Sequence, residues 1–307
     1  MAKPATEDNS ASFRRAFLHG ISGCFAGMIS AATFFPLDLV KTIQQNKEIG
    51  KSKLLPTAAK VVRHGGFRSL YSGLSVNLYG SGSAWGLYFF GYNFLQDCIR
   101  DYKGGPGLTS SDHFLAANVT GGTVCVVTNP IWVVKTRMQI QKTANIEPVY
   151  RNLWDGLYKL ATKEKLYGLT RGLGPNLLNV VHGSIHIATY ERLRRLAAQH
   201  FPSDSPFDPR QVELSSAQTM ICAAAAKTFA LITTYPLQVF RTRQHRVPRH
   251  QAPQYDGVLR MARTILANEG FSGLYKGVQT ASLREIPATC VTFLVYESIK
   301  AKLLPLL

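Results

Sequence analysis

The sequence predicts an all-α membrane protein in which six transmembrane helices form three pseudo-symmetric repeats. The first observation is a motif that occurs three times, as FPLDLVKTIQQ at 35–45, NPIWVVKTRMQ at 129–139 and YPLQVFRTRQH at 235–245. The second is composition, because hydrophobic residues make up 46 % of the 307 residues and charged residues only 17 %, against about 25 % charged in a typical soluble domain. The third is the length of the apolar segments, close to the roughly twenty residues that cross a bilayer.

Two further marks follow each proline motif in the same order. The glycine marks are GGFRSLYSG at 65–73, EKLYGLTRG at 164–172 and EGFSGLYKG at 269–277. The tyrosine marks are YNFLQ at 92–96, YERLR at 190–194 and YESIK at 296–300. Three marks recurring at intervals of about a hundred residues indicate copies of one module. The predicted units are an N-terminal tail at 1–16 and repeats at 17–105, 106–205 and 206–307.

Each repeat contains two long candidate helices, one ending after the proline motif and one starting after the glycine mark. They lie at 17–45 and 74–99, at 113–141 and 174–198, and at 215–244 and 279–303. Polar residues interrupt all six, and the mean hydropathy of the chain is only −0.02. We therefore expect one face of each helix to meet lipid and the other a water-accessible cavity. A soluble all-α protein is the alternative.

The formal net charge of +17 suits a nucleic acid, an anionic membrane surface or an anionic substrate. Basic residues flank the apolar runs instead of forming one basic face, which argues against nucleic-acid binding.

Six spans place both termini on one side of the membrane. The longer connections at 47–71, 142–171 and 246–276 then lie on the other side, and their basic excess suits the side that positive loops prefer.

Other signals are negative. No nucleophile elbow, Walker loop or dinucleotide fingerprint is present, so we expect neither an enzyme nor a permanently bound cofactor. His182 and His186 stand four apart without a third ligand, so no metal site is predicted. The tail at 1–16 resembles neither a signal peptide nor a transit peptide. Five scattered cysteines are interpreted as small packing residues: Cys24, Cys98, Cys125, Cys222 and Cys290.

The tripled P-x-[DE]-x-x-[KR] type of motif, with the glycine and tyrosine marks in phase, resembles the mitochondrial carrier family over nearly the whole chain. The resemblance implies a six-helix monomer with short matrix-side helices that alternates access between cytosol and matrix. It implies the mitochondrial inner membrane, with a peroxisomal or plastid membrane as the alternative. The helix kinks are expected at Pro36, Pro130 and Pro236.

The resemblance also implies a matrix gate formed after each proline. Here Asp38 is the one acid that remains, since Trp132 and Gln238 hold the equivalent positions, while all three basic positions are kept. We therefore expect a single ion pair, Asp38–Lys135, with glutamines bracing it from below and His245 in the third brace position. The predicted matrix gate consists of Asp38, Lys41, Gln45, Trp132, Lys135, Gln139, Gln238 and Arg241.

The tyrosine marks imply a cytosolic gate on the opposite side. Its first copy is neutral, so Glu191–Lys300 is the one complete ion pair expected there. The predicted cytosolic gate consists of Asn93, Gln96, Glu191, Arg194, Glu297 and Lys300. With so few ion pairs, low closing energies are expected on both sides.

Trp132, Gln238 and the segment SAWGLYFFGYN at 83–93 resemble the folate and FAD carriers within this family. The segments at 227–243 and 284–297 strengthen that likeness. NAD and pyrimidine-nucleotide carriers are near relatives with the same P-[IL]-W element. The resemblance implies a large aromatic anion as the transported substrate.

Two cations lie at the depth of a central substrate site. At about 1.5 Å per helical residue, Lys227 lies roughly 13 Å from Pro236 and Arg284 roughly 10 Å from Gly277, near the middle of a core about 30 Å thick. Family spacing implies contact points at Arg284, at Gly80 and near Leu178 and Asn179, with Gly80 leaving room for a ring on which Trp85 stacks. Two alternatives remain: Lys227 pairs with Glu285, and Trp85 is ordinary packing. The predicted substrate-binding residues are Gly80, Trp85, Leu178, Asn179, Lys227 and Arg284.

The glycines that close the second mark stand where the chain re-enters a span. Gly73, Gly172 and Gly277 are predicted to bind cardiolipin phosphates through helix N-termini. Tyr71 and Tyr275, beside the glycine marks, are predicted to brace the adjacent helices.

Overall fold

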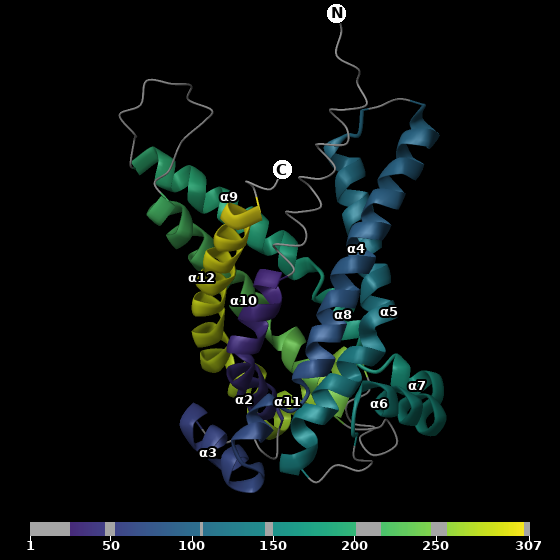
Figure 1. The fold of residues 1–307 in the computed structure, drawn as a ribbon, viewed down its shortest axis with the longest axis vertical. Helices are drawn as coiled ribbons and strands as arrows, with labels where there is room; N and C mark the ends of the chain where they lie inside the picture. Colours follow the sequence, from purple (N-terminus) through teal and green to yellow (C-terminus); the bar gives the residue numbers. More distant parts are fainter. Residues whose placement is uncertain are drawn as a thin grey trace, which may run out of the picture.

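The structure, a computed structural model, describes residues 25–46, 53–104, 107–144, 150–200, 216–246 and 257–303, and every regular element in these ranges is helical (Figure 1). The long helices follow the predicted pairs. They are Phe25–Thr33 with α2 (Phe35–Gln44), α4 (Leu74–Lys103), α5 (Ser110–Ala144), α8 (Leu173–Leu178) with α9 (Val181–His200), α10 (Ser216–Arg246) and α12 (Val278–Leu303).

The three motif prolines have different local effects. Phe25–Thr33 and α2 meet at an angle of 60°, and Pro36 occupies the first turn of α2, where a missing N–H costs nothing because that N–H has no partner inside the helix. Pro130 and Pro236 lie inside α5 and α10, which stay continuous. The sharp break therefore belongs to the first repeat alone.

The single helix predicted over 174–198 is wrong. The chain ends α8 at Leu178 and resumes as α9 at Val181. Between them the backbone tightens into i→i+3 bonds, from the Val180 N–H to the Leu177 carbonyl (3.0 Å) and from the His182 N–H to the Asn179 carbonyl (3.0 Å). The second long helix of this repeat is therefore interrupted by one tightened turn.

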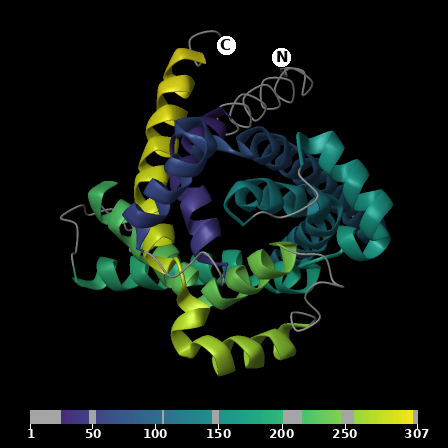
Figure 2. The same cartoon turned by 90° about the horizontal axis from the view of Figure 1, so that it is seen from below.

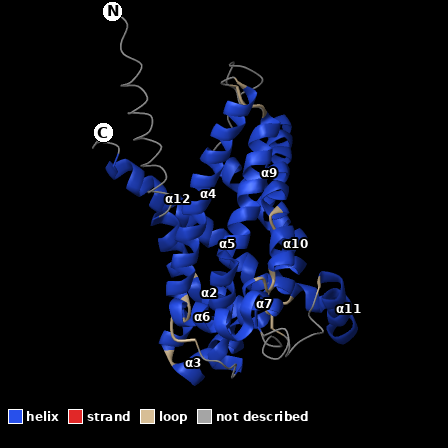
Figure 3. Ribbon diagram, turned by 90° about the vertical axis from the view of Figure 1, so that its right-hand side faces the viewer, coloured by secondary structure: helices blue, strands red, loops and turns tan. Residues whose placement is uncertain are grey.

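Short helices gather at one end of the bundle, as the resemblance implied (Figure 3). Figure 2, viewed from below, shows α11 in yellow-green at the outer edge. Each short helix leads into a tight turn before the glycine that starts the next long helix. These elements are α3 (Leu54–Gly65) with η1 (Phe67–Tyr71), α6 (Leu153–Lys159) with η2 (Leu160–Glu164) and α7 (Lys165–Leu169), and α11 (Val258–Glu269) with η5 (Phe271–Tyr275).

The buried apolar core lies at this same end, in three clusters that each join a short helix to a proline-containing helix. Met261 of α11 packs with Tyr235 of α10, and Val61 of α3 packs with Phe35 of α2. Of the described cysteines, Cys222 is buried, as the packing interpretation predicts, Cys125 and Cys290 are partly buried, and Cys98 is exposed. The core anchors the helix ends that carry the proline motifs.

Hydropathy alone identifies fewer spans than six. Among the described residues, Ser111–Gln141 and Gln218–Arg246 are long and apolar enough to cross a bilayer, and the bent pair Phe25–Gln44 would be a third. The other long helices carry more polar residues, as expected where one face lines a polar interior.

Candidate functional site

A cavity of about 840 Å³ lies between the long helices, with lining residues from α2, α4, α5, α8, α9, α10 and α12. Its aromatic side chains are Trp85, Tyr88 and Trp132. Its charged side chains are Asp38, Lys41, Lys135, Arg241, Arg284 and Glu285. The cavity thus combines flat apolar surfaces with an excess of positive charge.

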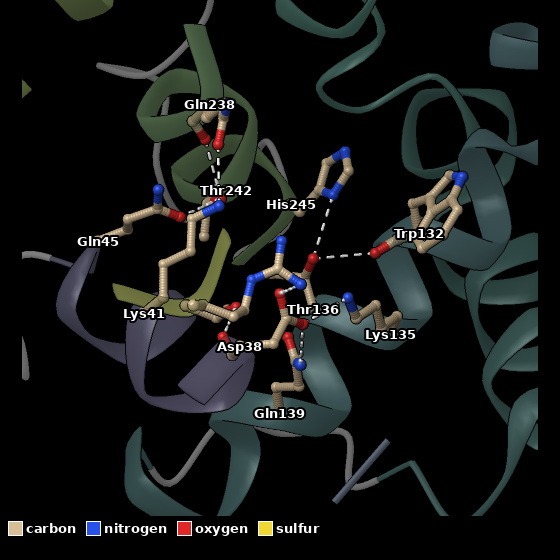
Figure 4. Close-up of polar contacts among 12 residues, drawn as sticks. Asp38, Lys41, Gln45, Trp132, Lys135, Thr136, Gln139, Gln238, Thr242 and His245 are labelled. Carbon is tan, nitrogen blue, oxygen red and sulfur yellow. Dashed lines mark hydrogen bonds and ion pairs between the residues drawn. The ribbon is translucent and has the colours of Figure 1, made fainter. Parts of the chain in front are cut away.

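Contacts among α2, α5 and α10 close one end of the cavity (Figure 4). Lys135 Nζ lies 2.8 Å from Asp38 Oδ2, which confirms the ion pair predicted from the sequence. Gln139 Nε2 donates to the same oxygen at 3.2 Å, so the glutamine braces this pair as expected. Between α2 and α10, Lys41 Nζ donates to Gln238 Oε1 at 2.9 Å. An amide oxygen thus accepts where the first repeat has a carboxylate.

The third contact, between α5 and α10, uses an aromatic ring. The Arg241 guanidinium carbon lies 5.5 Å from the centroid of Trp132, and Lys135 Nζ lies 5.4 Å from the same ring. Cations within about 6 Å of an indole face are attracted by its quadrupole. We call the six residues that close this end in a cycle the floor ring: Asp38, Lys41, Trp132, Lys135, Gln238 and Arg241.

A second layer of polar contacts lies at the next turn of the same helices. Thr242 Oγ1 donates to Gln45 Oε1 at 2.7 Å, and Thr136 Oγ1 lies 3.3 Å from His245 Nδ1 (Figure 4). The first contact joins α10 to α2 and the second joins α5 to α10, and these are helix pairs that the floor ring also joins. His245 therefore occupies the third brace position, as the register predicted.

Two buried ion pairs below this layer were missed by the sequence reasoning. Arg137 binds Glu164 through both terminal nitrogens, and Arg243 binds Glu269 at 2.6 and 2.8 Å. Burial raises the pKa of Glu269, but Arg243 and Lys276 outweigh it and lower the pKa to about 2. The signal was present in the sequence, since each arginine stands two residues after the motif base and each glutamate opens a glycine mark.

Three of the predicted substrate-binding residues line the cavity: Trp85, Asn179 and Arg284. Leu178 is half exposed and is not part of the lining. Lys227 does not line the cavity either. Its ammonium is held 3.0 Å from Glu285 Oε2 and donates to Thr289 Oγ1 at 2.9 Å. The alternative pairing of Lys227 with Glu285 is therefore the one that the structure has.

Gly80 does not leave an open space for a ring. It is buried on α4, and a Cβ atom there would lie 3.0 Å from the Ile131 side chain and 3.5 Å from Trp132. The missing side chain instead allows α4 and α5 to approach closely, and it lets the Trp132 indole pack against the α4 backbone. Room for a ring comes from the cavity beside Trp85 and Trp132.

The predicted cytosolic residues make no gate contact with one another among the side chains that the structure describes. Gln96 is 3.0 Å from His113 Nδ1 and Asn93 is exposed. Glu191 pairs with Arg195 at 3.7 Å. The side chains of Glu297 and Lys300 lie outside the described residues, so the Glu191–Lys300 pair stays a prediction. Arg194 also lies on α9 near this end.

The three glycines that precede re-entering helices all have left-handed backbones, with φ of +86° at Gly73, +71° at Gly172 and +84° at Gly277. Contact distances add to this requirement. A Cβ atom at Gly172 would lie 2.4 Å from His245, and one at Gly277 would lie 3.0 Å from the Tyr235 hydroxyl. Glycine is therefore required here for packing and backbone geometry, whatever binds nearby.

The predicted bracing tyrosines stack on the residues that precede the motif prolines. Tyr71 lies 6.4 Å from Phe35 and Tyr275 lies 6.2 Å from Tyr235, measured between ring centroids. In the second repeat Asn129 takes this place. Among the described residues no group of three histidine, cysteine, aspartate or glutamate side chains could hold a metal ion.

Comparison with known proteins agrees with the threefold repeat. The family model described as mitochondrial carrier protein matches residues 14–103, 107–201 and 212–305. A chloroplastic folate transporter of Arabidopsis thaliana is 32 % identical over 91 % of this chain and 92 % of its own length. A chloroplastic nicotinamide adenine dinucleotide transporter of the same plant is 32 % identical over 91 % and 89 %. A mitochondrial FAD carrier of Saccharomyces cerevisiae is 30 % identical over 92 % and 96 %.

Proposed function

This chain belongs to the mitochondrial carrier family, and we propose that it moves a large aromatic anion, FAD or folate, across a membrane by alternating access. Members of this family are membrane-embedded transporters and not enzymes. The proposal therefore concerns the identity of the substrate and the residues that recognise it.

The observation that carries the proposal is the pairing of indole and phenol rings with cations in one cavity. Trp85 and Tyr88 offer ring faces on which a flavin or pterin ring stacks, Trp132 adds apolar lining, and Arg241 and Arg284 attract phosphate or carboxylate groups. The volume of about 840 Å³ falls in the range of about 300 to 1,000 Å³ that holds ligands of this size.

The three relatives are named as carriers of folate, NAD and FAD, which supports an aromatic cofactor as the substrate. NAD is the second candidate, because a carrier named for it matches as much of the chain as the folate transporter does. A pyrimidine nucleotide is the remaining alternative. All four present a flat ring and a negative group.

Alternating access requires that the floor ring open and reclose. One ion pair, one hydrogen bond and one ring contact hold it, which are weaker together than three ion pairs would be in a dry interior. We assign the floor ring to the matrix side and Asn93, Gln96, Glu191, Arg194, Glu297 and Lys300 to a cytosolic gate. The six long helices are then six spans.

The proposed transport function also implies a membrane, an oligomeric state and a set of partners. We place the carrier in the mitochondrial inner membrane as a functional monomer, with a peroxisomal or plastid membrane as the alternative, since one relative is named as chloroplastic and another as mitochondrial. Cardiolipin at Gly73, Gly172 and Gly277 stays a prediction. No nucleic-acid partner and no permanently bound cofactor are expected.

A thermal-shift screen of the purified chain tests the substrate. Because a ligand that binds the folded state raises its apparent stability, FAD or a folate should raise the unfolding temperature more than FMN, NAD or pyrimidine nucleotides do. Arg284→Ala should abolish the shift. A shift with none of these compounds, or an undiminished shift in Arg284→Ala, would contradict the proposal and favour a membrane adaptor that has lost transport.

A further inference from the structure

Glu285 is a carboxylate inside the cavity that none of the sequence motifs singled out. It follows Arg284 on α12 and lines the cavity, with a side chain that is 19 % exposed. One carboxylate oxygen accepts a hydrogen bond from Arg284 Nη2, and the other lies 3.0 Å from Lys227 Nζ. Glu285 therefore bridges the two cations that the sequence assigned to the anionic part of the substrate.

Arg284 still has capacity for another acceptor. Its Nη1 lies 3.9 Å from Asp38 Oδ1, which is outside hydrogen-bond distance. Its Nε is buried and has no hydrogen-bond partner among the described residues. A buried unpaired N–H of a charged group is costly. A substrate oxygen that accepts a hydrogen bond from Arg284 Nε removes that cost, so it binds more favourably than an oxygen that meets an N–H already bonded within the protein.

The charge of the cavity lining is small once both carboxylates are counted. Four of its charged side chains are basic and two, Asp38 and Glu285, are acidic. The lining therefore has an excess of two positive charges, which complements a dianion such as a diphosphate diester or a dicarboxylate. A nucleoside triphosphate brings more negative charge than this lining neutralises, and like charges at short range disfavour binding.

We propose that Glu285 determines specificity for charge: it occupies Arg284 and Lys227 in the empty carrier, yields Arg284 to the anionic group of the substrate, and limits that substrate to dianions. The inference rests on the proposed function, because it concerns the same cavity. The basic groups that face Glu285 are Arg284 on its own helix, Lys227 on α10 and Lys41 on α2.

Competition between FAD, a dianion, and ATP, which has the greater charge, tests this role in the purified full-length chain. Glu285→Gln should lower the apparent Kd for ATP about tenfold while changing that for FAD much less, because one repulsive charge close to the ligand is removed. Asp97→Asn is the matched control, since it removes one negative charge from an exposed residue of α4 that pairs with Arg100. This control should keep the wild-type ratio of ATP to FAD affinity.

A second variant keeps the test decisive if Glu285→Gln folds poorly. Lys227→Gln removes the ammonium that neutralises Glu285 from outside the lining, so Glu285 should repel the more highly charged anion more strongly and shift the ratio the other way, toward FAD. An unchanged ratio in both variants would show that Glu285 is a structural partner of Lys227 and would overturn the inference. If the wild-type chain binds neither FAD nor folate, the ratio is measured between ATP and another dianion that binds, such as NADH, so the proposed substrate fails while the charge limit is still tested. A wild-type chain that binds ATP in preference to every dianion would overturn the inference, and a chain that binds no anion would overturn both.

Discussion

The second repeat secures its proline helix with two amide hydrogen bonds, and the third uses one hydroxyl hydrogen bond together with stacked rings. Asn129 Nδ2 donates to the carbonyl oxygens of Leu169 at 2.7 Å and Arg171 at 3.0 Å, whereas Tyr235 donates its hydroxyl to the Lys276 carbonyl oxygen at 2.9 Å and stacks on Tyr275. Both contacts join the residue before the proline to the turn before the next long helix. Both repeats therefore keep a hydrogen bond to the carbonyl oxygen that precedes the re-entry glycine, and they differ in the side chain that donates it and in the contact beside it.

The first repeat extends the comparison to the buried ion pairs. The second and third repeats each bury an arginine–glutamate pair, but Ile43 and Gly65 hold the corresponding positions in the first repeat. Ile43 packs with Val61 and Ile140 there. Equivalent positions of the repeats therefore hold a buried ion pair in two copies and an apolar cluster in the first.

Arg243→Ala should have the largest effect on stability. It would leave Glu269 buried and without its main partner, and such a loss costs about 3 to 5 kcal/mol. Thermal unfolding in detergent measures it. Arg100→Ala is the control, because Arg100 pairs with Asp97 at the surface and such pairs contribute about 0 to 1 kcal/mol.

The apolar first repeat suggests how to rescue this loss. Arg243→Ile combined with Glu269→Gly should recover much of the stability by copying the first repeat. The pH dependence provides a further check. Because the pKa of Glu269 is lowered to about 2 from 4.5, its contribution is complete above about pH 4.5 and is lost as the pH falls toward 2. Equal losses in Arg243→Ala and Arg100→Ala would contradict a stabilising pair.

Asp38→Asn should come next in size and should exceed Gln238→Ala. The first change leaves Lys135 without its carboxylate in a site where both side chains are mostly buried, which costs about 3 kcal/mol. The second removes a neutral acceptor from Lys41, which costs about 1 to 2 kcal/mol. Unfolding temperatures of the two variants, measured side by side, test the order. A larger loss in Gln238→Ala would mean that the ion pair does not dominate the floor ring.

Asn129→Ala should destabilise by about 1 to 2 kcal/mol, because two backbone carbonyls lose a buried donor. The comparison predicts its rescue. Asn129→Tyr together with Thr170→Tyr places the third-repeat ring pair in the second repeat and should recover part of the loss. Unfolding of the single and double variants measures this coupling. Additive losses would show that the tyrosine pair, with its hydroxyl donor and stacked rings, cannot replace the two amide hydrogen bonds at this position.

The smallest effect is expected at the turn after the short helix. Gly66 and Gly270 have positive φ there, and Lys165 of the second repeat has φ of +53° at the equivalent position. Lys165 also has ψ of −145°, and such a sparsely populated backbone conformation costs a non-glycine residue about 1 to 3 kcal/mol, so Lys165→Gly should raise stability, by about 1 kcal/mol after the greater chain entropy of glycine. Gly270→Lys is the converse control and should lower stability. No gain in Lys165→Gly would show that the turn is relaxed.

Register made part of this architecture predictable. The three prolines place Asp38 and Lys135 at fixed offsets on neighbouring helices, and their ion pair followed from those offsets. The presence of Trp132 at an acidic position was also evident from the sequence. Its contacts with both Lys135 and Arg241 were not predictable, because they depend on how the indole packs against Gly80.

Other features depend on packing that a single sequence does not display. The break after Leu178 has neither proline nor glycine at its centre, and it arises from a locally tightened turn. The occupation of Lys227 by Glu285 requires α10 and α12 to be placed side by side. Depth along a helix was predictable, whereas the direction in which the Lys227 ammonium points was not.

Uptake of radiolabelled FAD and folate into liposomes that contain the purified chain tests the central claim most directly. We predict saturable uptake of one of them that is driven by the same compound inside, and its loss in Arg284→Ala although that variant remains folded. Absence of uptake for both compounds by folded wild-type protein, or equal uptake by wild type and Arg284→Ala, would contradict the account.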